Sequence, residues 1–454
     1  MKKRLLRLAI LVCALGVLIG GYFLIAALTK DDTETAVTPP LLSVAADDLK
    51  TLAWTYNNAT VSLTRADDGT WSCDGAAAFP LDQDQVTTMT GVLQNMTATL
   101  TIDDPADLSE YGFDQPQCVI DLTKKDGTAL ELKIGDYNAV ASAYYFETPD
   151  GVYAVSSAVQ TAFCKTLCDL AVKETVPDFQ NVTAVAVSDG QQTHTLEYVD
   201  AGDAAAYSGA FRWFEDGDRA QALSPDRMDT YLTSLTVTFS KCVDWNANDT
   251  TLSTYGLGAN AASVTVTYGN GQTFKLWLGS ENDAGRFARI DGSGMVYLVA
   301  SADADALLAA SYDDLKPDRL LSLDWDEVTA FDVTAGGQTV TLIADADSGW
   351  LCRGVALETT LSDNLKNALT GLTLSTDAAG TPAAGAQTVV IAVYQDRTGW
   401  EQLDLTLTET DAGWLASFNG QNSSVSADAV TALTSAVQAV TDSFSGTSVP
   451  TTGN

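Results

Sequence analysis

The feature of this sequence that most constrains its fold is an internal repeat. The segment from Tyr111 to Leu170 recurs, in altered form, from Tyr255 to Ala310. Three landmark pairs share one spacing of 144 positions, namely Tyr111 and Tyr255, Gly135 and Gly279, and Tyr153 and Tyr297. A fixed period is typical of a chain that is built from a repeated structural unit, because each copy must bury its own apolar face.

Both copies carry the same order of short motifs. Each begins with Tyr-Gly followed by Phe113 or Leu257, continues through a strand-like run to a two-residue turn, and closes a second run with Ile-Gly or Leu-Gly. A later turn, Asp150-Gly151 or Asp291-Gly292, is followed by a Val-Tyr-x-Val strand. Apolar runs that alternate and are joined by such turns predict antiparallel strands.

The length of 454 residues allows about three domains. We therefore expect an α+β fold with repeated modules at residues 49–172, 180–315 and 325–441, each a twisted antiparallel sheet with helices packed on one side. The third copy is degenerate, since it lacks the Tyr-Gly pair and the Leu-Gly ending. Such a departure is expected of a terminal repeat that caps an array.

Helices are predicted in all three modules, and capping signals mark their starts in the first two. Asp82 precedes apolar residues that recur three and four positions apart, and Ser224-Pro225 combines a serine cap with a proline in the first turn. In the third module, helices are predicted over about Ser362 to Leu372 and from Ser426 to Val440.

Residues 1–30 have the sequence pattern of a membrane anchor. Basic residues precede an uncharged run from Leu8 to Leu28, whose 21 residues suffice to cross a bilayer core of about 30 Å. The alternative is a cleaved signal peptide, whose apolar region is usually about 7–15 residues and ends in a small-x-small site. We expect an uncleaved signal-anchor helix with residues 31–454 outside the cell. Residues 31–48 are then a stalk, and residues 442–454 a disordered tail.

The charge balance excludes nucleic acid as a partner. The chain has 59 acidic and 24 basic residues, which gives a formal net charge of −35 at pH 7. A surface this negative repels phosphate backbones, and it suits a soluble domain in the extracytoplasmic space.

The seven cysteines, at positions 13, 73, 118, 164, 168, 242 and 352, form no Cys-x-x-Cys motif. Cys164 and Cys168 lie four residues apart on a predicted helix, where a disulfide is geometrically awkward. We interpret the cysteines as buried single thiols. Cys73 and Cys352 occur in matching Trp-x-Cys sequences, which predicts the same inward strand position in two modules.

No residue set amounts to recognised catalytic chemistry. The one histidine, His194, cannot build a multi-histidine zinc site, and we interpret it as an exposed or edge-strand residue. Asp345-Ala346-Asp347 resembles the start of a calcium loop, but position twelve is Ala356 where a glutamate belongs. Gly256-Leu257-Gly258 mimics a dinucleotide fingerprint but precedes a predicted strand. We therefore assign no catalytic, metal-binding or cofactor-binding residues and expect no cofactor.

Taken as a set, the motifs resemble the bacterial family known as domain of unknown function 4340. The set comprises the Tyr-Gly start, the Asp-Gly hairpin, the Leu-x-(Ile/Leu)-Gly ending and the Val-Tyr-x-Val strand, behind one N-terminal membrane helix. The resemblance covers about residues 49–441 and is weakest in the third module. It implies membrane anchoring and a gene often placed beside a gliding-motility-type ABC transporter, with transporter subunits as partners. No catalytic residues are carried over from the family.

The sequence therefore favours a single-pass membrane protein with a non-enzymatic binding or scaffolding ectodomain, of unspecified oligomeric state. One alternative is a carboxylate-dependent hydrolase or binder of cell-envelope polysaccharide, in which two carboxylates lie about 5–9.5 Å apart. Another is a structural spacer whose modules serve only for reach. With 59 acidic residues, the sequence alone singles out no carboxylate pair.

Overall fold

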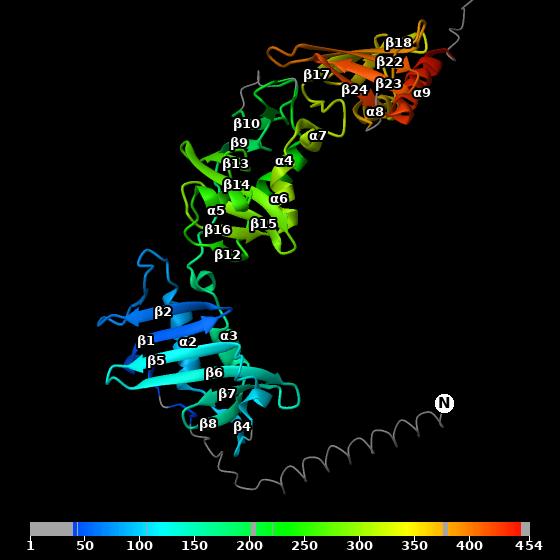
Figure 1. Ribbon diagram of the computed structural model, residues 1–454. Coiled ribbons are helices and arrows are strands. Elements are labelled where there is room, and N and C mark those ends of the chain that lie inside the picture. The colour runs from blue at the N-terminus through cyan, green and yellow to red at the C-terminus, as the bar shows by residue number, and fades with distance from the viewer. Residues whose placement is uncertain are drawn as a thin grey trace, which may run out of the picture. The chain divides into compact units, whose positions relative to one another are not determined.

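The computed structural model describes residues 40–42, 44–105, 107–200, 206–219, 221–375 and 380–445. Within them the chain forms three eight-stranded sheets, at residues 49–155, 182–299 and 328–425 (Figure 1). The first sheet belongs to one compact unit, residues 1–172, and the other two belong to a second unit, residues 173–454. The prediction of repeated modules of antiparallel sheet is confirmed.

The first sheet is made of two meanders joined by a helical crossover. Its strands are β1 (Leu49–Tyr56), β2 (Ala59–Arg65), β3 (Trp71–Cys73), β4 (Ala98–Ile102), β5 (Cys118–Lys124), β6 (Ala129–Asn138), β7 (Ala143–Thr148) and β8 (Gly151–Val155), in the spatial order β3-β2-β1-β5-β6-β7-β8-β4. Its helices are η1 (Ala46–Asp48), α2 (Gln83–Gln94), η2 (Leu108–Tyr111), α3 (Ala158–Phe163) and η3 (Leu167–Leu170). The strand after α2 crosses to the far edge and pairs antiparallel with β8.

The second sheet repeats this order. Its strands are β9 (Val182–Ser188), β10 (Thr193–Tyr198), β11 (Trp213–Glu215), β12 (Lys241–Asp244), β13 (Ala262–Tyr268), β14 (Gln272–Asn282), β15 (Gly285–Ile290) and β16 (Val296–Val299), arranged β11-β10-β9-β13-β14-β15-β16-β12. Its helices are α4 (Pro225–Ser234), α5 (Asp249–Thr254), α6 (Ser301–Leu308) and α7 (Tyr312–Leu315).

The third sheet keeps the topology, with one strand reduced to a bridge and one short edge strand, residues 355–356, added. Its strands are β17 (Val328–Ala335), β18 (Gln338–Asp345), β19 (Gly349–Cys352), β20 (Val355–Ala356), β21 (Thr388–Gln395), β22 (Gln402–Thr410), β23 (Gly413–Phe418) and β24 (Gln421–Val425), arranged β20-β19-β18-β17-β21-β22-β23-β24. Its helices are α8 (Thr359–Thr370) and α9 (Ala427–Ser445). After α8, a single bridge between Leu374 and Val425 stands where β4 and β12 stand in the other modules. This copy is therefore a degenerate version of the same module.

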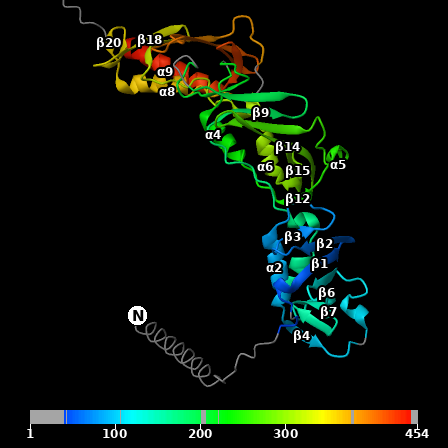
Figure 2. The same cartoon turned by 90° about the vertical axis from the view of Figure 1, so that its left-hand side faces the viewer.

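Alternation of side chains gives each sheet one apolar face, and helices cover it. In β1, Leu52 and Trp54 are fully buried while the residues between and beside them are half-exposed. Figure 2 shows α2 against one face of the first sheet, and α4 and α6 against one face of the second. Helices α2 and α4 begin where the capping signals predict. Asp82 accepts hydrogen bonds from the backbone N–H groups of Asp84 and Gln85, and Ser224 accepts one from that of Arg227.

The third-module helices differ in their bounds from the prediction. The first begins at Thr359 rather than Ser362 and ends at Thr370, and its N-cap residue Glu358 makes no side-chain cap. The second continues to Ser445, because Phe444, one turn after Val440, also packs against the core of the module. The start of the predicted disordered tail is therefore helical.

The second module also buries its other sheet face in part. Leu252 of α5 and Leu257 form a small core with Val296, and Tyr255, Trp277 and Phe287 pack around it. Figure 2 shows α5 on the side of the strands opposite α4 and α6. The expectation that helices lie on one side only is therefore wrong for this module.

The Tyr-Gly and Leu-Gly motifs of the second module hold α5 to that face. A β-carbon on Gly279 would lie 2.2 Å from the carbonyl oxygen of Tyr255, and one on Gly256 would lie 2.6 Å from the backbone nitrogen of Ser280. The same backbone nitrogen donates to the Tyr255 carbonyl at 2.9 Å. The motif is thus a packing device rather than a nucleotide-binding loop.

No helix in the described residues is long and apolar enough to cross a membrane. The predicted anchor at residues 1–30 lies outside the part of the chain that the structure describes, as do residues 31–39 of the predicted stalk.

Candidate functional site

A groove lies between helices in both the first and the second module. In the first, α2 and α3 border a groove of about 350 Å³. In the second, α4, α6 and α7 border one of about 510 Å³. Thr88 and Thr230 line the two grooves at matching positions, since each lies 17 residues after the tryptophan of the third strand. The start of α3 lines the first groove, through Ala158 and Val159, whereas the end of α6 lines the second, through Ala306 and Ala309, so the two grooves share only part of their position in the module.

The larger groove has an apolar floor and a charged rim. The side chain of Tyr231 lies at its floor, 5% exposed, and its hydroxyl donates to the carbonyl of Leu307 at 3.0 Å, which joins α4 to α6. Burial raises the pKa of Tyr231, so the hydroxyl stays neutral. The remaining lining residues are Asp226, Arg227, Thr230, Ser234, Ala306, Ala309, Asp314 and Leu315. A groove of this composition suits the apolar face of a partner helix.

Arg227 fixes one end of this groove. Its guanidinium donates to the backbone carbonyl of Asp314 at 2.8 Å and pairs with the carboxylate of Asp318. These contacts tie α4 to the end of α7, so the wall of the groove is held by hydrogen bonds as well as by packing.

A second polar site lies on the third strand of the second module. Cys73 and Cys352 are buried opposite Leu63 and Leu342, which confirms that they share one inward position. At the equivalent position, opposite Leu196, the second module carries Glu215, which is 5% exposed. A carboxylate in a position that is otherwise apolar needs a partner.

That partner is His194. Its Nδ1 lies 2.6 Å from Oε1 of Glu215, and its side chain is 37% exposed. The interpretation of His194 as an exposed or edge-strand residue holds only in part, because the side chain is half-exposed but β10 lies between β9 and β11 and the ring contacts a buried acid. When Nδ1 carries the proton it donates to the carboxylate, and Nε2 is left to accept a hydrogen bond. Among the described residues, Nε2 has no hydrogen-bond partner.

The surroundings of this pair are anionic and aromatic. Burial first, and then the charges of Glu215, Asp313 and Asp218, raise the pKa of Tyr312. The Arg219 guanidinium stacks 4.5 Å from the ring of Phe214. No serine, threonine or cysteine in the described residues hydrogen-bonds to His194, and Glu215 is the partner that holds its half-exposed ring.

Residues that follow β10 belong to the core of the third module. Ala206, Tyr207, Phe211 and Phe214 pack into one buried cluster with residues of β17, β21 and β22. Arg397, 4% exposed, donates through Nε to the carbonyl of Ala206 at 2.7 Å and through Nη1 to both carboxylate oxygens of Glu327 at 3.0 Å. The second and third modules therefore share one core.

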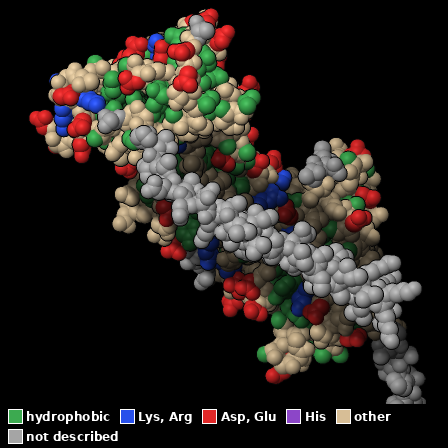
Figure 3. Space-filling view, turned by 90° about the horizontal axis from the view of Figure 1, so that it is seen from below, with side chains coloured by type: hydrophobic (Ala, Val, Ile, Leu, Met, Phe, Trp, Pro, Cys, Tyr) green, Lys and Arg blue, Asp and Glu red, His purple; other side chains and the backbone are tan. Residues whose placement is uncertain are grey.

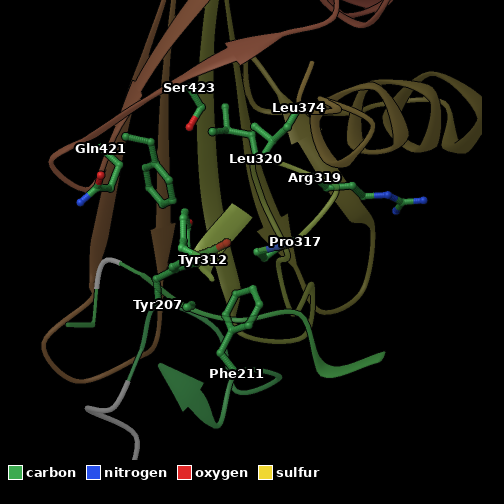
Figure 4. Close-up of a pocket in the computed structure, with 11 residues that line it drawn as sticks. Tyr207, Phe211, Tyr312, Pro317, Arg319, Leu320, Leu374, Gln421 and Ser423 are labelled. Atoms are coloured by element: carbon green, nitrogen blue, oxygen red, sulfur yellow. The ribbon is translucent and has the colours of Figure 1, made fainter. Parts of the chain in front are cut away.

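A cavity of about 40 Å³ lies at this junction (Figure 4). In the view, Tyr312, Pro317 and Phe211 lie together below Leu320, while the guanidinium of Arg319 points away from them. The volume holds a few water molecules but is far below the roughly 300 Å³ of a typical ligand pocket. The cavity is therefore a packing feature.

The first module presents one carboxylate pair on its open sheet face. Asp121 of β5 and Glu131 of β6 are cross-strand partners, and both side chains are exposed. Burial first, and then the charge of Glu131, raise the pKa of Asp121. Neither residue lines the groove between α2 and α3.

The described residues contain no group of three or more His, Cys, Asp or Glu side chains that could hold a metal ion. Figure 3 shows acidic side chains spread over the face it presents, with basic side chains in smaller scattered groups. The acidic excess is therefore spread over this face as solvated charge.

Comparison with known proteins identifies a family. A sequence model described as "Domain of unknown function (DUF4340)" matches residues 71–257 and 213–384. Both matches begin at the tryptophan of a third strand, Trp71 in β3 and Trp213 in β11. No curated protein and no solved structure matches the chain. Because the two matches together cover more than half of its length, the chain belongs to the DUF4340 family.

Proposed function

We propose that this protein is a single-pass membrane protein whose ectodomain is a non-enzymatic binding scaffold, accessory to an ABC-type transporter complex. The observation that carries the binding role is the groove between α4 and α6, with its apolar floor, its charged rim and its volume of about 510 Å³. The basic-then-apolar pattern of residues 1–30 supports the anchor. The family resemblance supports the transporter as the partner.

The charge of the groove selects the chemistry of the partner segment. Asp226 and Asp314 lie on its rim, and the chain carries a net charge of −35. The only basic side chain in its lining, Arg227, is already paired with Asp318. A basic amphipathic helix of a transporter subunit places its apolar face on Tyr231 and Leu315 and its cationic face on this rim.

Filling the groove tests the proposal. Ala306 is an exposed residue of α6 that lines the groove, and Ala302 is an exposed residue one turn earlier that does not. We expect Ala306→Trp to lower the recovery of transporter subunits, in affinity capture of the anchored chain from its own membrane, by about tenfold or more. Ala302→Trp should leave the recovery unchanged. Equal recovery from both variants and the unmodified chain would contradict the proposed site.

The second candidate is a hydrolase or binder of cell-envelope polysaccharide. The pairing of Asp121 with Glu131, and the raised pKa of Asp121, favour it. If it holds, Asp121→Asn abolishes hydrolysis or binding of isolated envelope glycan, while Ala306→Trp has no effect on either. Unchanged glycan hydrolysis and binding in Asp121→Asn exclude this candidate.

A further inference from the structure

Two cysteines of the first module meet at the junction of a strand and a helix. Cys118 is the first residue of β5 and is fully buried, and Cys164 is the C-cap residue of α3. Sγ of Cys118 lies 3.6 Å from the carbonyl oxygen of Phe163, the residue before Cys164, and the two thiols are close enough for each to shift the pKa of the other. Both are free cysteines, as predicted, but Cys164 is half-buried rather than buried.

The backbone around Cys164 is held on both sides. The ring of Phe163 packs edge-on against Trp54 with centroids 6.2 Å apart. The indole nitrogen of Trp54 donates to the carbonyl of Lys165 at 2.9 Å, and Nζ of Lys165 donates to Gln85 at 3.0 Å. The Cys164 side chain is therefore fixed beside β5 and does not depend on a flexible segment to reach Cys118.

The repeat provides an independent observation. The positions 144 residues after Cys118 and Cys164 hold Ala262 and Leu308. Ala262 is again the first residue of its strand, and Leu308 is the last residue of α6. Both cysteines are thus exchanged together, while the strand and the helix that carry them are kept. The second module keeps this strand and this helix without the two sulfurs, so the fold of the module does not need them.

The contact shifts the pKa values of the two thiols in opposite directions. The hydrogen bond with Cys118 lowers the pKa of Cys164, and the same contact, together with burial, raises that of Cys118. Cys164 is half-buried, whereas Cys118 is inaccessible. The more accessible sulfur is therefore the one that reaches the thiolate state, as an attacking cysteine requires.

We propose that Cys118 and Cys164 are a disulfide site, oxidised by a disulfide reagent or a thiol–disulfide oxidoreductase of the extracytoplasmic space. The Cys164 thiolate attacks one sulfur of the oxidant's disulfide, which breaks and releases one thiolate. The Cys118 thiol then loses its proton, and its sulfur attacks Cys164 Sγ in the mixed disulfide, releasing the second thiolate. Two protein thiols are oxidised, and one disulfide is reduced to two thiols.

Oxidised glutathione tests this site in the full-length chain. After reduction, removal of the reductant and exposure to oxidised glutathione, we expect the unfolded chain to offer two fewer thiols to iodoacetamide. Peptide mapping should recover one cross-linked pair that contains Cys118 and Cys164. The midpoint of thermal unfolding of the first unit should rise by about 5–10 °C, because the bond closes a long loop.

Two variants distinguish this disulfide from other oxidation products. Cys168→Ser should still form the Cys118–Cys164 bond, whereas Cys118→Ala, the residue found in the second module, should stop at a glutathione adduct on Cys164. Peptide mapping of the unmodified chain tests the proposal even if neither variant folds. A Cys164–Cys168 bond, a lasting adduct on Cys164 in the unmodified chain, or no reaction would each overturn the proposal.

Discussion

A β-carbon on Gly135 would lie 2.1 Å from the carbonyl oxygen of Tyr111. The two residues come from the end of the Leu-x-Ile-Gly run and from the Tyr-Gly pair, the two motifs that define the repeat. A β-carbon on Gly112 would in turn lie 2.9 Å from the backbone nitrogen of Asp136. In the first module this contact lies where the pairing of β6 with β7 shifts register, between Ile134 and Tyr137. In the second module the pairing of β14 with β15 shifts register between Leu278 and Glu281. Glycine is thus retained at these positions because a β-carbon would clash with the backbone of the facing segment.

Gly135→Ala should lower the free energy of unfolding of the first unit by about 3 kcal/mol, because the methyl group forces the backbone of Tyr111 to move. Gly91→Ala is the matched control, since a β-carbon there meets nothing within 4 Å. It lies within α2, so alanine should be neutral or stabilise by up to about 1 kcal/mol. Urea denaturation measures both. An equal effect of the two substitutions would contradict the backbone contact.

The contact between His194 and Glu215 should appear as an energetic coupling. In a double-mutant cycle with His194→Ala and Glu215→Ala, we expect a coupling free energy of about 1–2 kcal/mol, as befits one charge-assisted hydrogen bond with one half-exposed partner. Glu197 is an exposed acid on the same strand, β10, and serves as the control. The cycle of His194→Ala with Glu197→Ala should be additive. Additivity in both cycles would show that the 2.6 Å contact has no energetic role.

Arg397→Ala should destabilise the second unit by about 3 kcal/mol, because it leaves Glu327 and the carbonyl of Ala206 without their donor. Lys316→Ala removes an ion pair with Asp313, whose side chain is 83% exposed, and should cost less than about 1 kcal/mol. Guanidinium unfolding followed by circular dichroism compares them. If the unmodified unit unfolds in one step and Arg397→Ala in two, the shared core depends on this arginine. A cost no larger than that of Lys316→Ala would contradict this role.

The pH dependence of stability should distinguish two aspartates of the first module. Asp121 has a raised pKa, from burial and then from Glu131, so its contribution to stability is present below about pH 4 and is lost as the pH rises through the raised value. Asp121→Asn should therefore stabilise the unit slightly at pH 7 and not at pH 3.

The pKa shift of Asp126 has the opposite sign to that of Asp121. Hydrogen bonds from Thr128 lower its pKa, so its contribution is present above about pH 4 and is lost as the pH falls through the lowered value. Asp126→Asn should then destabilise at pH 7. Thermal melts at the two pH values measure both substitutions. A loss of stability in Asp121→Asn at pH 7 would contradict the assigned direction.

The module order, the antiparallel sheets and the caps at Asp82 and Ser224 could be predicted from the sequence because they depend on local signals. Turn residues, alternation and capping groups lie within a few positions of the structure they specify. The inward position of Cys73 and Cys352 could be predicted for the same reason, since it follows from strand alternation and from a repeated Trp-x-Cys sequence.

The polar contacts could not be predicted because they depend on tertiary packing and strand register. His194 meets Glu215 only because β10 and β11 pair Leu196 with Glu215. A signal was nevertheless present, because aligning the three Trp-x-x triplets places a glutamate where the other modules have cysteine. The groove between α4 and α6 depends on how the two helices pack, and no local pattern marks it.

Crosslinking from the groove tests the binding role most directly. Thr230 and Thr233 are exposed threonines of α4, and each hydroxyl donates to the carbonyl four residues earlier, but only Thr230 lines the groove. A photoreactive amino acid is placed at either position in the anchored chain, and the products formed in its own membrane are identified. The account predicts a crosslink to a transporter subunit from position 230 and none from position 233. Crosslinks of equal yield from both positions, or none from position 230, would contradict it.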